Sequence, residues 1–177
     1  LDAGIFVVAA AGNNGNKANI NDVSIPANIP GVIAVGASTV DGKIWANSSV
    51  GSNIDPYSSE EREFPNQKPE VTAPGVRMFS TASTEISPPY AYSTGTSDST
   101  VIVVGALALI LQIHGNQMRG DDNKFDFEEM NMVKEALANS SLMSQDVDAI
   151  HSNKSGYGEM NAAAWLEEIR TEFSLNS

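Results

Sequence analysis

Ser97 is the residue with the clearest chemical potential, because it stands between a small polar turn and a long apolar segment. Residues 92–100 form a short and mostly polar stretch that contains Gly95, and residues 101–111 carry no polar side chain. Gly95 permits a sharp turn, since glycine adopts φ > 0 without a steric penalty, and Thr96 is a suitable N-cap. Ser97 would then lie in the first turn of a helix, where free N–H groups and the helix dipole stabilise an alkoxide or a tetrahedral oxyanion.

Two secondary structures are open for the apolar segment. Residues 101–104 are β-branched and could form a buried strand after an ordinary turn. The segment continues to Ile113, beyond the usual length of a strand, which favours a helix. The apolar stretch is too short to predict a membrane span. A polar link is expected to follow it at residues 116–123.

Composition excludes several function classes. The chain has 177 residues and a formal net charge of −12, from 10 Lys and Arg against 22 Asp and Glu. Nucleic-acid binding is not expected, because phosphate neutralisation needs basic clusters. Without cysteine there is no disulfide, thiol nucleophile or thiolate metal site. Two histidines are too few for a histidine metal cluster, so no metal site is predicted.

The remaining pattern is typical of an α/β sheet. Residues 4–11 and 31–36 read as buried parallel strands, the first ending in a Gly-Asn turn, and ligands of such sheets bind at the strand carboxyl ends. Residues 77–81 predict a short strand and residues 84–92 a loop. Residues 41–67 are polar and read as a surface insertion. Helices are expected after the caps Asp126, with a capping box to Glu129, and Asn161.

Six segments together resemble the subtilisin-like serine proteases (subtilases), in the order found in that family. They are residues 7–13, 25–27, 31–37, 68–76, 95–97 and 156–162. They cover nearly the whole chain apart from residues 41–66 and the link after His114, and they match only the later half of the catalytic domain. The resemblance implies a single partial domain over residues 1–177. Its fold would be a three-layer α/β fold with a mainly parallel sheet flanked by helices, incomplete at its N-terminal side.

The resemblance also implies site residues. Ser97 corresponds to the nucleophile and Asn13 to the side-chain donor of the oxyanion hole. Other positions correspond to the S1 pocket, with Ser24 at its floor and a wall formed by Ala10, Ala11, Gly12 and Asn14. A Ser where the family often has Gly should shorten that pocket slightly. The substrate would be a peptide or protein. No cofactor is needed for the chemistry, a structural calcium ion is an open question, and the family has both secreted and intracellular members.

The chain departs from the family in two respects. The family sequence runs Gly-Thr-Ser-Met-Ala-x-Pro-His, whereas Asp98 and Ser99 follow Ser97 here. The catalytic Asp and His of the family precede the region equivalent to Leu1, and neither His114 nor His151 matches them. We therefore expect a serine endopeptidase whose Asp and His come from an upstream segment, and an inactive isolated chain. The alternative is a catalytically inactive scaffold or interaction module derived from a subtilase.

Overall fold

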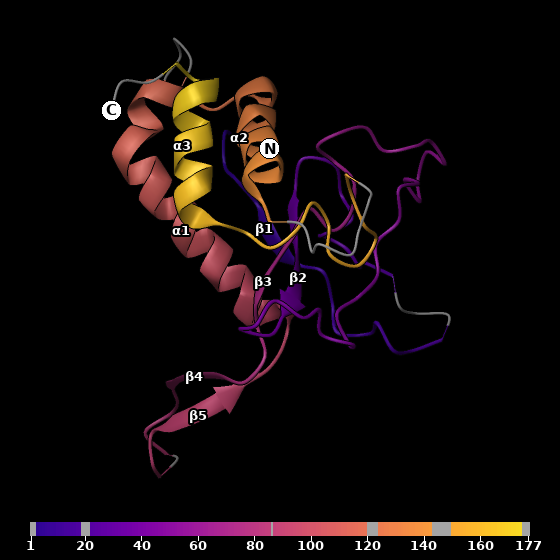
Figure 1. Cartoon of the computed structure of the whole chain (residues 1–177), viewed down its shortest axis with the longest axis vertical. Coiled ribbons are helices and arrows are strands. Elements are labelled where there is room, and N and C mark those ends of the chain that lie inside the picture. Colours follow the sequence, from indigo (N-terminus) through magenta and orange to yellow (C-terminus); the bar gives the residue numbers. More distant parts are fainter. Residues whose placement is uncertain (1–2, 19–21, 86, 120–123, 143–149, 175–177) are drawn as a thin grey trace.

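The computed structural model describes residues 3–18, 22–85, 87–119, 124–142 and 150–174. The elements are β1 (Val8–Ala10), β2 (Ile33–Ser38), β3 (Val71–Pro74), β4 (Met78–Thr81), β5 (Tyr90–Ser93), α1 (Thr96–Met118), α2 (Phe127–Ser140) and α3 (Ala162–Glu172). Figure 1 shows the central sheet, the three helices grouped beside it and the β4–β5 hairpin projecting from the body. The sheet is parallel throughout in the order β1-β2-β3, which confirms the predicted α/β class.

The two faces of the sheet are covered differently. Alternate residues such as Ile33, Val35 and Val71 pack into one core with apolar side chains of all three helices, including the fully buried Trp165. The intervening residues form a second, smaller core with residues of the loop that leads into β2. Because side chains alternate along a strand, one face carries the helices and the other is covered by loop in the described part of the chain.

Helix α1 settles the choice between helix and strand for the apolar segment, and it corrects two details. The helix begins at Thr96 with Gly95 as its N-cap, so Thr96 is not the cap that the sequence predicts. It continues to Met118 and absorbs the first residues of the expected polar link. Helix α1 has 23 residues, and an 18-residue window within it has a mean hydropathy of 1.7, which is long and apolar enough to cross a membrane. Core helices pass the same test, and α1 packs on β1, β2 and β3.

One side of α1 and the outer edge of β1 are uncovered. Val101 is 67% exposed and Leu109 62%, so the helix is not buried all round. β1 pairs only with β2 among the described strands. Between Phe6 and Val8 on one side and Leu107 on the other lies an apolar cavity of about 520 Å³. The sheet is therefore open on this side, as its resemblance to half of a domain implies.

Three other sequence predictions have different outcomes. The capping box between Asp126 and Glu129 is present, and the Asn161 side chain accepts a hydrogen bond from the Ala164 amide at the start of α3. Residues 84–92 are not a simple loop, because residues 90–93 form β5 and pair antiparallel with β4. The segment 41–67 is largely irregular and exposed, but it is not wholly on the surface, since Ser49 and Arg62 are buried.

A buried ionic cluster joins α2 to the sheet. Glu70 Oε1 lies 2.7 Å from the ammonium groups of both Lys68 and Lys134, and all three side chains are almost completely buried. Glu70 Oε2 accepts a hydrogen bond from the Ala34 amide at 2.8 Å, and Lys68 donates to the Val32 carbonyl at 2.6 Å. Burial lowers the pKa of Lys68 to about 8. The cluster thus holds β2, the approach to β3 and α2 together through one carboxylate.

We expect Glu70→Gln to destabilise the fold strongly. The change leaves two buried ammonium groups without a countercharge, and removing one partner of a buried ion pair costs about 3–5 kcal/mol. The free energy of unfolding is measured by urea titration with tryptophan fluorescence, which reports the fully buried Trp165 together with the half-buried Trp45. The control, Glu63→Gln, removes an exposed carboxylate and should change the unfolding free energy by less than about 0.5 kcal/mol. Equal effects of both changes would contradict this role for Glu70.

Candidate active site

The loop after β1 is fastened to the first residue of α1. Asn13 Oδ1 accepts hydrogen bonds from the Thr96 amide at 3.0 Å and from the Thr96 hydroxyl at 2.9 Å. The Thr96 hydroxyl in turn accepts from the Gly12 amide at 3.2 Å. Thr96 therefore serves as the bridge between two segments 83 residues apart, a role that helix-cap reasoning does not reveal.

This bridge brings the two predicted catalytic residues to one place. Ser97 follows Thr96 directly in the first turn of α1, and both Ser97 and Asn13 are exposed. Because Thr96 engages Asn13 Oδ1, the Nδ2 group of the same amide is left as a donor; no hydrogen bond from it is found within the described residues. The first amides of a helix have no intrahelical acceptor. An exposed hydroxyl thus stands beside a carboxamide donor and the positive end of a helix.

Close backbone packing holds the turn before Ser97. The Gly95 amide donates to the Gly75 carbonyl at 2.9 Å, which ties the turn to the end of β3. A Cβ on Gly75 would lie 2.6 Å from the Gly95 carbonyl oxygen and would overlap the buried Ser99 hydroxyl. A Cβ on Gly95 would lie 3.2 Å from Asn13 Nδ2. Glycine is needed at position 75 because no side chain fits against the turn.

The residues predicted to form the S1 pocket occupy one region. Gly12 and Ser24 are neighbours, since a Cβ on Gly12 would lie 3.5 Å from Ser24 Oγ. The Ser24 amide also donates to the Ala11 carbonyl at 3.3 Å. Ala11 is fully buried, whereas Ala10, Gly12 and Asn14 are half-buried and Ser24 is exposed. The Ala11 methyl group therefore packs into the smaller core and does not line an open surface.

Ser49 is a structural member of the site that sequence reasoning missed. Its amide donates to the Gly12 carbonyl at 2.8 Å, and its hydroxyl accepts from the Asn14 amide at 3.3 Å. Ser49 is fully buried, and its two hydrogen-bond partners are the residues before and after Asn13. It sits in the polar segment expected on the surface, where nothing in the sequence distinguishes it from Ser48 or Ser52.

Asp98 places a carboxylate next to Ser97. Its Oδ2 accepts a hydrogen bond from the Ser93 hydroxyl at 2.9 Å, and the side chain is half-buried. A negative charge in the first turn suits the helix dipole, but it opposes an oxyanion formed nearby.

Neither histidine is placed to act on Ser97. His114 lies on α1, about 25 Å along the helix from Ser97 at 1.5 Å per residue, and it contacts Gln117 and Arg170. His151 contacts the Pro69 carbonyl through Nε2 at 2.9 Å, and burial lowers its pKa. Because of these positions, neither histidine is suited to act as the general base for Ser97, as the sequence also indicates.

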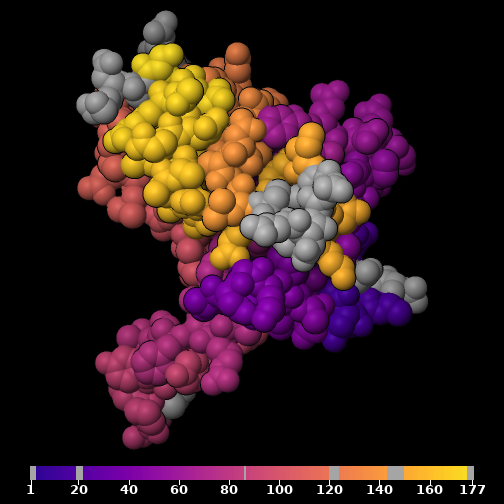
Figure 2. All heavy atoms as spheres, viewed as in Figure 1, coloured from indigo at the N-terminus to yellow at the C-terminus, as the bar shows by residue number. Residues whose placement is uncertain are grey.

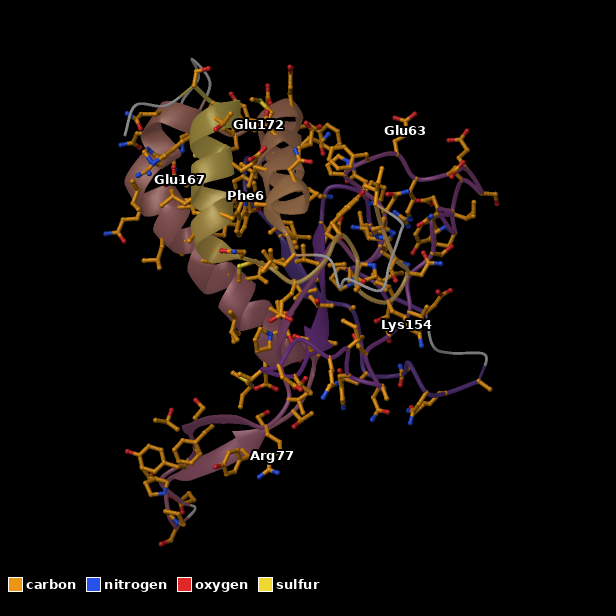
Figure 3. The ribbon with its side chains drawn as sticks, viewed as in Figure 1. Phe6, Glu63, Arg77, Lys154, Glu167 and Glu172 are labelled. Atoms are coloured by element: carbon orange, nitrogen blue, oxygen red, sulfur yellow. The ribbon has the colours of Figure 1, made fainter. Side chains whose placement is uncertain are left out.

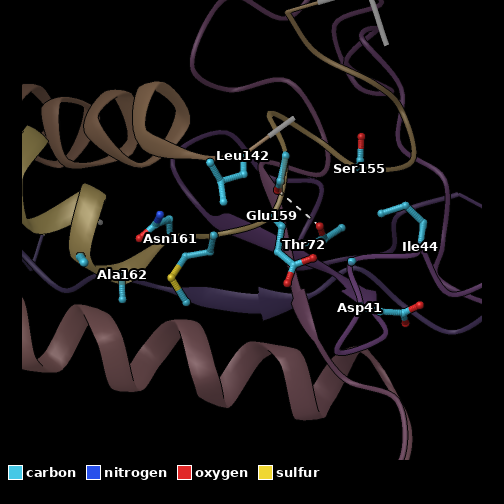
Figure 4. A pocket seen from close by; sticks show the side chains of 12 residues that line it. Asp41, Ile44, Thr72, Leu142, Ser155, Glu159, Asn161 and Ala162 are labelled. Carbon is cyan, nitrogen blue, oxygen red and sulfur yellow. Dashed lines mark hydrogen bonds between the residues drawn. The ribbon is translucent and has the colours of Figure 1, made fainter. Parts of the chain in front are cut away.

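A cavity of about 720 Å³ lies elsewhere, between the 41–44 turn and the start of α3 (Figure 4). Glu159 points into it, and burial raises the pKa of this carboxyl group. Neither Ser97 nor Asn13 lines this cavity. The chemistry-bearing residues instead lie at the exposed junction of β1 and α1.

A parallel α/β sheet with an exposed serine at a helix start and a neighbouring amide donor is the arrangement that the resemblance to serine proteases of the subtilisin type implies. The family model described as "Subtilase family" matches residues 1–158. The chain therefore belongs to the subtilase family.

Individual relatives agree with this assignment. The chain is 40% identical to subtilisin NAT of Bacillus subtilis subsp. natto over 114 residues, which are 64% of this chain and 25% of the relative. It is 34% identical to an extracellular protease of Xanthomonas campestris pv. campestris over 117 residues, 64% of this chain and 17% of the relative. Both matches span only a minor part of the relative's own length.

Solved structures resemble the fold over almost the whole chain. The prenylagaramide maturation protease PagA matches with a TM-score of 0.66 and 25% identity, over 94% of this chain and 51% of PagA. The PatG macrocyclase domain matches with a TM-score of 0.68 and 25% identity, over 95% of this chain and 44% of that domain. The chain thus spans about half the length of these structural relatives, which confirms the predicted partial subtilisin-like fold.

We expect Gly75→Ala to disturb the Ser97 turn. The added methyl group meets backbone and the buried Ser99 side chain, and overpacking of this kind costs about 1–3 kcal/mol. The matched control is Gly105→Ala, on an exposed part of α1 where a Cβ meets nothing within 4 Å. That change should stabilise the helix by about 0.5–1 kcal/mol. Urea unfolding of both variants checks the pair, and a neutral Gly75→Ala would refute the close packing.

Proposed function

We propose that this chain supplies the nucleophile and the oxyanion hole of a serine endopeptidase. Ser97 would attack the peptide carbonyl, and Asn13 would stabilise the oxyanion. The observation that carries the proposal is the pair of hydrogen bonds from Thr96 to Asn13 Oδ1. They hold the amide beside the helix start with its Nδ2 group available as a donor.

The reaction would proceed through an acyl-enzyme. Ser97 Oγ forms a bond to the carbonyl carbon while its proton passes to a general base, and the carbonyl oxygen becomes an oxyanion. Asn13 Nδ2 and the Ser97 amide donate hydrogen bonds to that oxygen. The C–N bond then breaks, and the leaving amine takes the proton from the base. Water attacks the acyl group in the second half and regenerates the Ser97 hydroxyl.

The general base and its orienting carboxylate would come from an upstream segment of the same catalytic domain. Without a base, a serine hydroxyl is a weak nucleophile. Both histidines of this chain are engaged elsewhere, and the chain spans only a quarter of subtilisin NAT. The upstream half would also cover the open edge of β1.

The substrate would be a peptide or protein whose side chain enters the pocket formed by the wall from Ala10 to Asn14 and the floor at Ser24. The Ser24 hydroxyl makes this pocket slightly shallower than a glycine floor would.

The described residues include no group of three or more His, Asp or Glu able to hold a metal ion, so no carboxylate cluster that could bind calcium is found among them. We assign no step to a metal or another cofactor.

Removing the Asn13 amide tests the oxyanion role. In the full-length protein, Asn13→Ala should lower kcat by about 10²–10³-fold with little change in KM, a magnitude established on subtilisin itself. Asn16→Ala, in the same exposed loop, is the control and should leave kcat unchanged. Steady-state hydrolysis of a fluorogenic peptide is the measurement. Equal kcat values for both variants would remove Asn13 from the mechanism.

Labelling with a fluorophosphonate probe tests the nucleophile. The isolated chain should neither hydrolyse peptides nor react, because it carries no base for Ser97. The full-length protein should react at Ser97, and Ser97→Ala should abolish labelling. A full-length protein that folds but never labels at Ser97 would overturn the catalytic assignment.

A second candidate function is an inactive scaffold that binds other proteins, and Asp98 is the observation that favours it. Its carboxylate lies beside Ser97 and would oppose the oxyanion. Asp98→Met in the full-length protein separates the two functions. A gain of proteolysis from an inactive parent indicates a degenerate enzyme, whereas measurable activity in both forms excludes the scaffold. We favour the protease because the Asn13–Thr96 bridge is intact.

A further inference from the structure

The β4–β5 hairpin carries an exposed aromatic face. Phe79 is 62% exposed, Tyr92 65% and Tyr90 49%. Phe79 pairs directly with Tyr92 across the hairpin, and Tyr90 lies two residues further along the same face. The Phe79 ring stacks on Tyr90 with centroids 5.6 Å apart and contacts Tyr92 at 5.1 Å. The three rings, which we call the aromatic face, form one continuous surface.

The hairpin stands away from the rest of the molecule. Figures 1 and 2 show it as a separate projection below the sheet and helices. Among the described strands, β4 and β5 pair only with each other, so the outer edge of each is free to accept another strand. Isolated two-stranded hairpins are only marginally stable in water, and clustered exposed aromatic residues commonly mark an interaction site.

The base of the hairpin is joined to the Ser97 turn. The Ser93 hydroxyl bonds Asp98, and the Arg77 amide donates to the Thr94 hydroxyl at 2.9 Å. Arg77 adopts φ 56°, which residues with a side chain rarely do, and its guanidinium lies 5.4 Å from the Tyr92 ring centroid. Figure 3 shows Arg77 at this base. The base of the hairpin is therefore fastened next to the candidate active site, with Ser93 on the face opposite the rings and Arg77 in contact with Tyr92.

We propose that the aromatic face is an accessory binding site for the peptide substrate. The inference rests on the proposed protease function. Its occupant is an extended substrate segment with apolar or aromatic side chains, a few residues from the bond to be cut. A four-residue strand at about 3.3 Å per residue accommodates about four residues of extended peptide. The free strand edge supplies main-chain hydrogen bonds and the rings receive alternate side chains.

The alternating geometry explains why the rings are on one face only. The opposite face of the hairpin carries no aromatic side chain: Ser80 pairs there with Ala91, and Met78 pairs with Ser93. An extended peptide that binds the edge would direct every second side chain toward the rings. The site thus selects for apolar residues at alternate positions, separately from the side chain that enters the S1 pocket.

Peptide binding to the full-length Ser97→Ala protein provides the first test, because it requires no catalysis. One fluorescently labelled peptide carries Phe and Leu in the four residues on each side of a common core, and a second carries Ser and Gly there. Fluorescence anisotropy should show the Phe/Leu peptide binding more tightly. The additional change Phe79→Ser or Tyr92→Ser should weaken it by about tenfold and leave the Ser/Gly peptide unchanged.

Two control variants isolate the aromatic face. Tyr57→Ser removes an aromatic ring that is 61% exposed but lies outside the hairpin, and Ala91→Ser alters the opposite face. Both should bind the Phe/Leu peptide as the parent does. In the catalytically competent protein, kcat/KM for the bare core peptide should not change in Phe79→Ser, which shows that the Ser97 turn remains folded.

The outcomes separate this inference from the proposed function. If the protein cuts no peptide but retains selective binding that Phe79→Ser and Tyr92→Ser abolish, the binding site stands and the catalytic assignment fails. If the protein cuts peptides but binds both labelled peptides equally, the accessory site is wrong. Gel filtration in which Phe79→Ser converts a dimer to a monomer, with peptide binding unchanged, would assign the aromatic face to a second copy and overturn the inference.

Discussion

The candidate site depends on the contact between the end of β1 and the start of α1. Thr96 bonds both Gly12 and Asn13, so one side chain fixes the strand loop against the helix. Without it, the exposed Ser97 hydroxyl and the Asn13 amide would have no defined spacing. The contact joins residues that are close in space but 83 positions apart in sequence. Through it, the packed sheet fixes the positions of the exposed residues Ser97 and Asn13.

Glycine and serine residues give this junction its close backbone approach. Gly75 lets the turn before Ser97 pack on the end of β3, and Ser49 braces the backbone on both sides of Asn13. In the proposed mechanism none of these residues reacts with substrate. They position Ser97 and Asn13, and this explains why a segment that reads as a surface insertion has a buried part at its centre.

The uncovered surfaces of the chain have different characters. The edge of β1 and the apolar side of α1 adjoin the main core and agree with a chain that spans about half of its structural relatives. The aromatic face stands apart from that core, on a hairpin fastened to the Ser97 turn. The first surface is therefore suited to completing the domain, and the second, under the proposed function, to binding a peptide substrate.

Several features of the fold and site were accessible from the sequence because their causes are local. The buried strands, the long helix after Gly95, the caps at Asp126 and Asn161, and the candidacy of Ser97 follow from periodicity, capping and turn chemistry. The family resemblance added Asn13 through motif order.

The Thr96 bridge, the Ser49 brace, the Glu70 cluster and strand β5 were not accessible in this way. Each depends on which distant segments meet, and an amino-acid pattern carries no direct information about a hydrogen bond between residues 83 positions apart. Only the packed tertiary structure decides those contacts, because burial and strand pairing select one partner among many chemically equivalent polar residues.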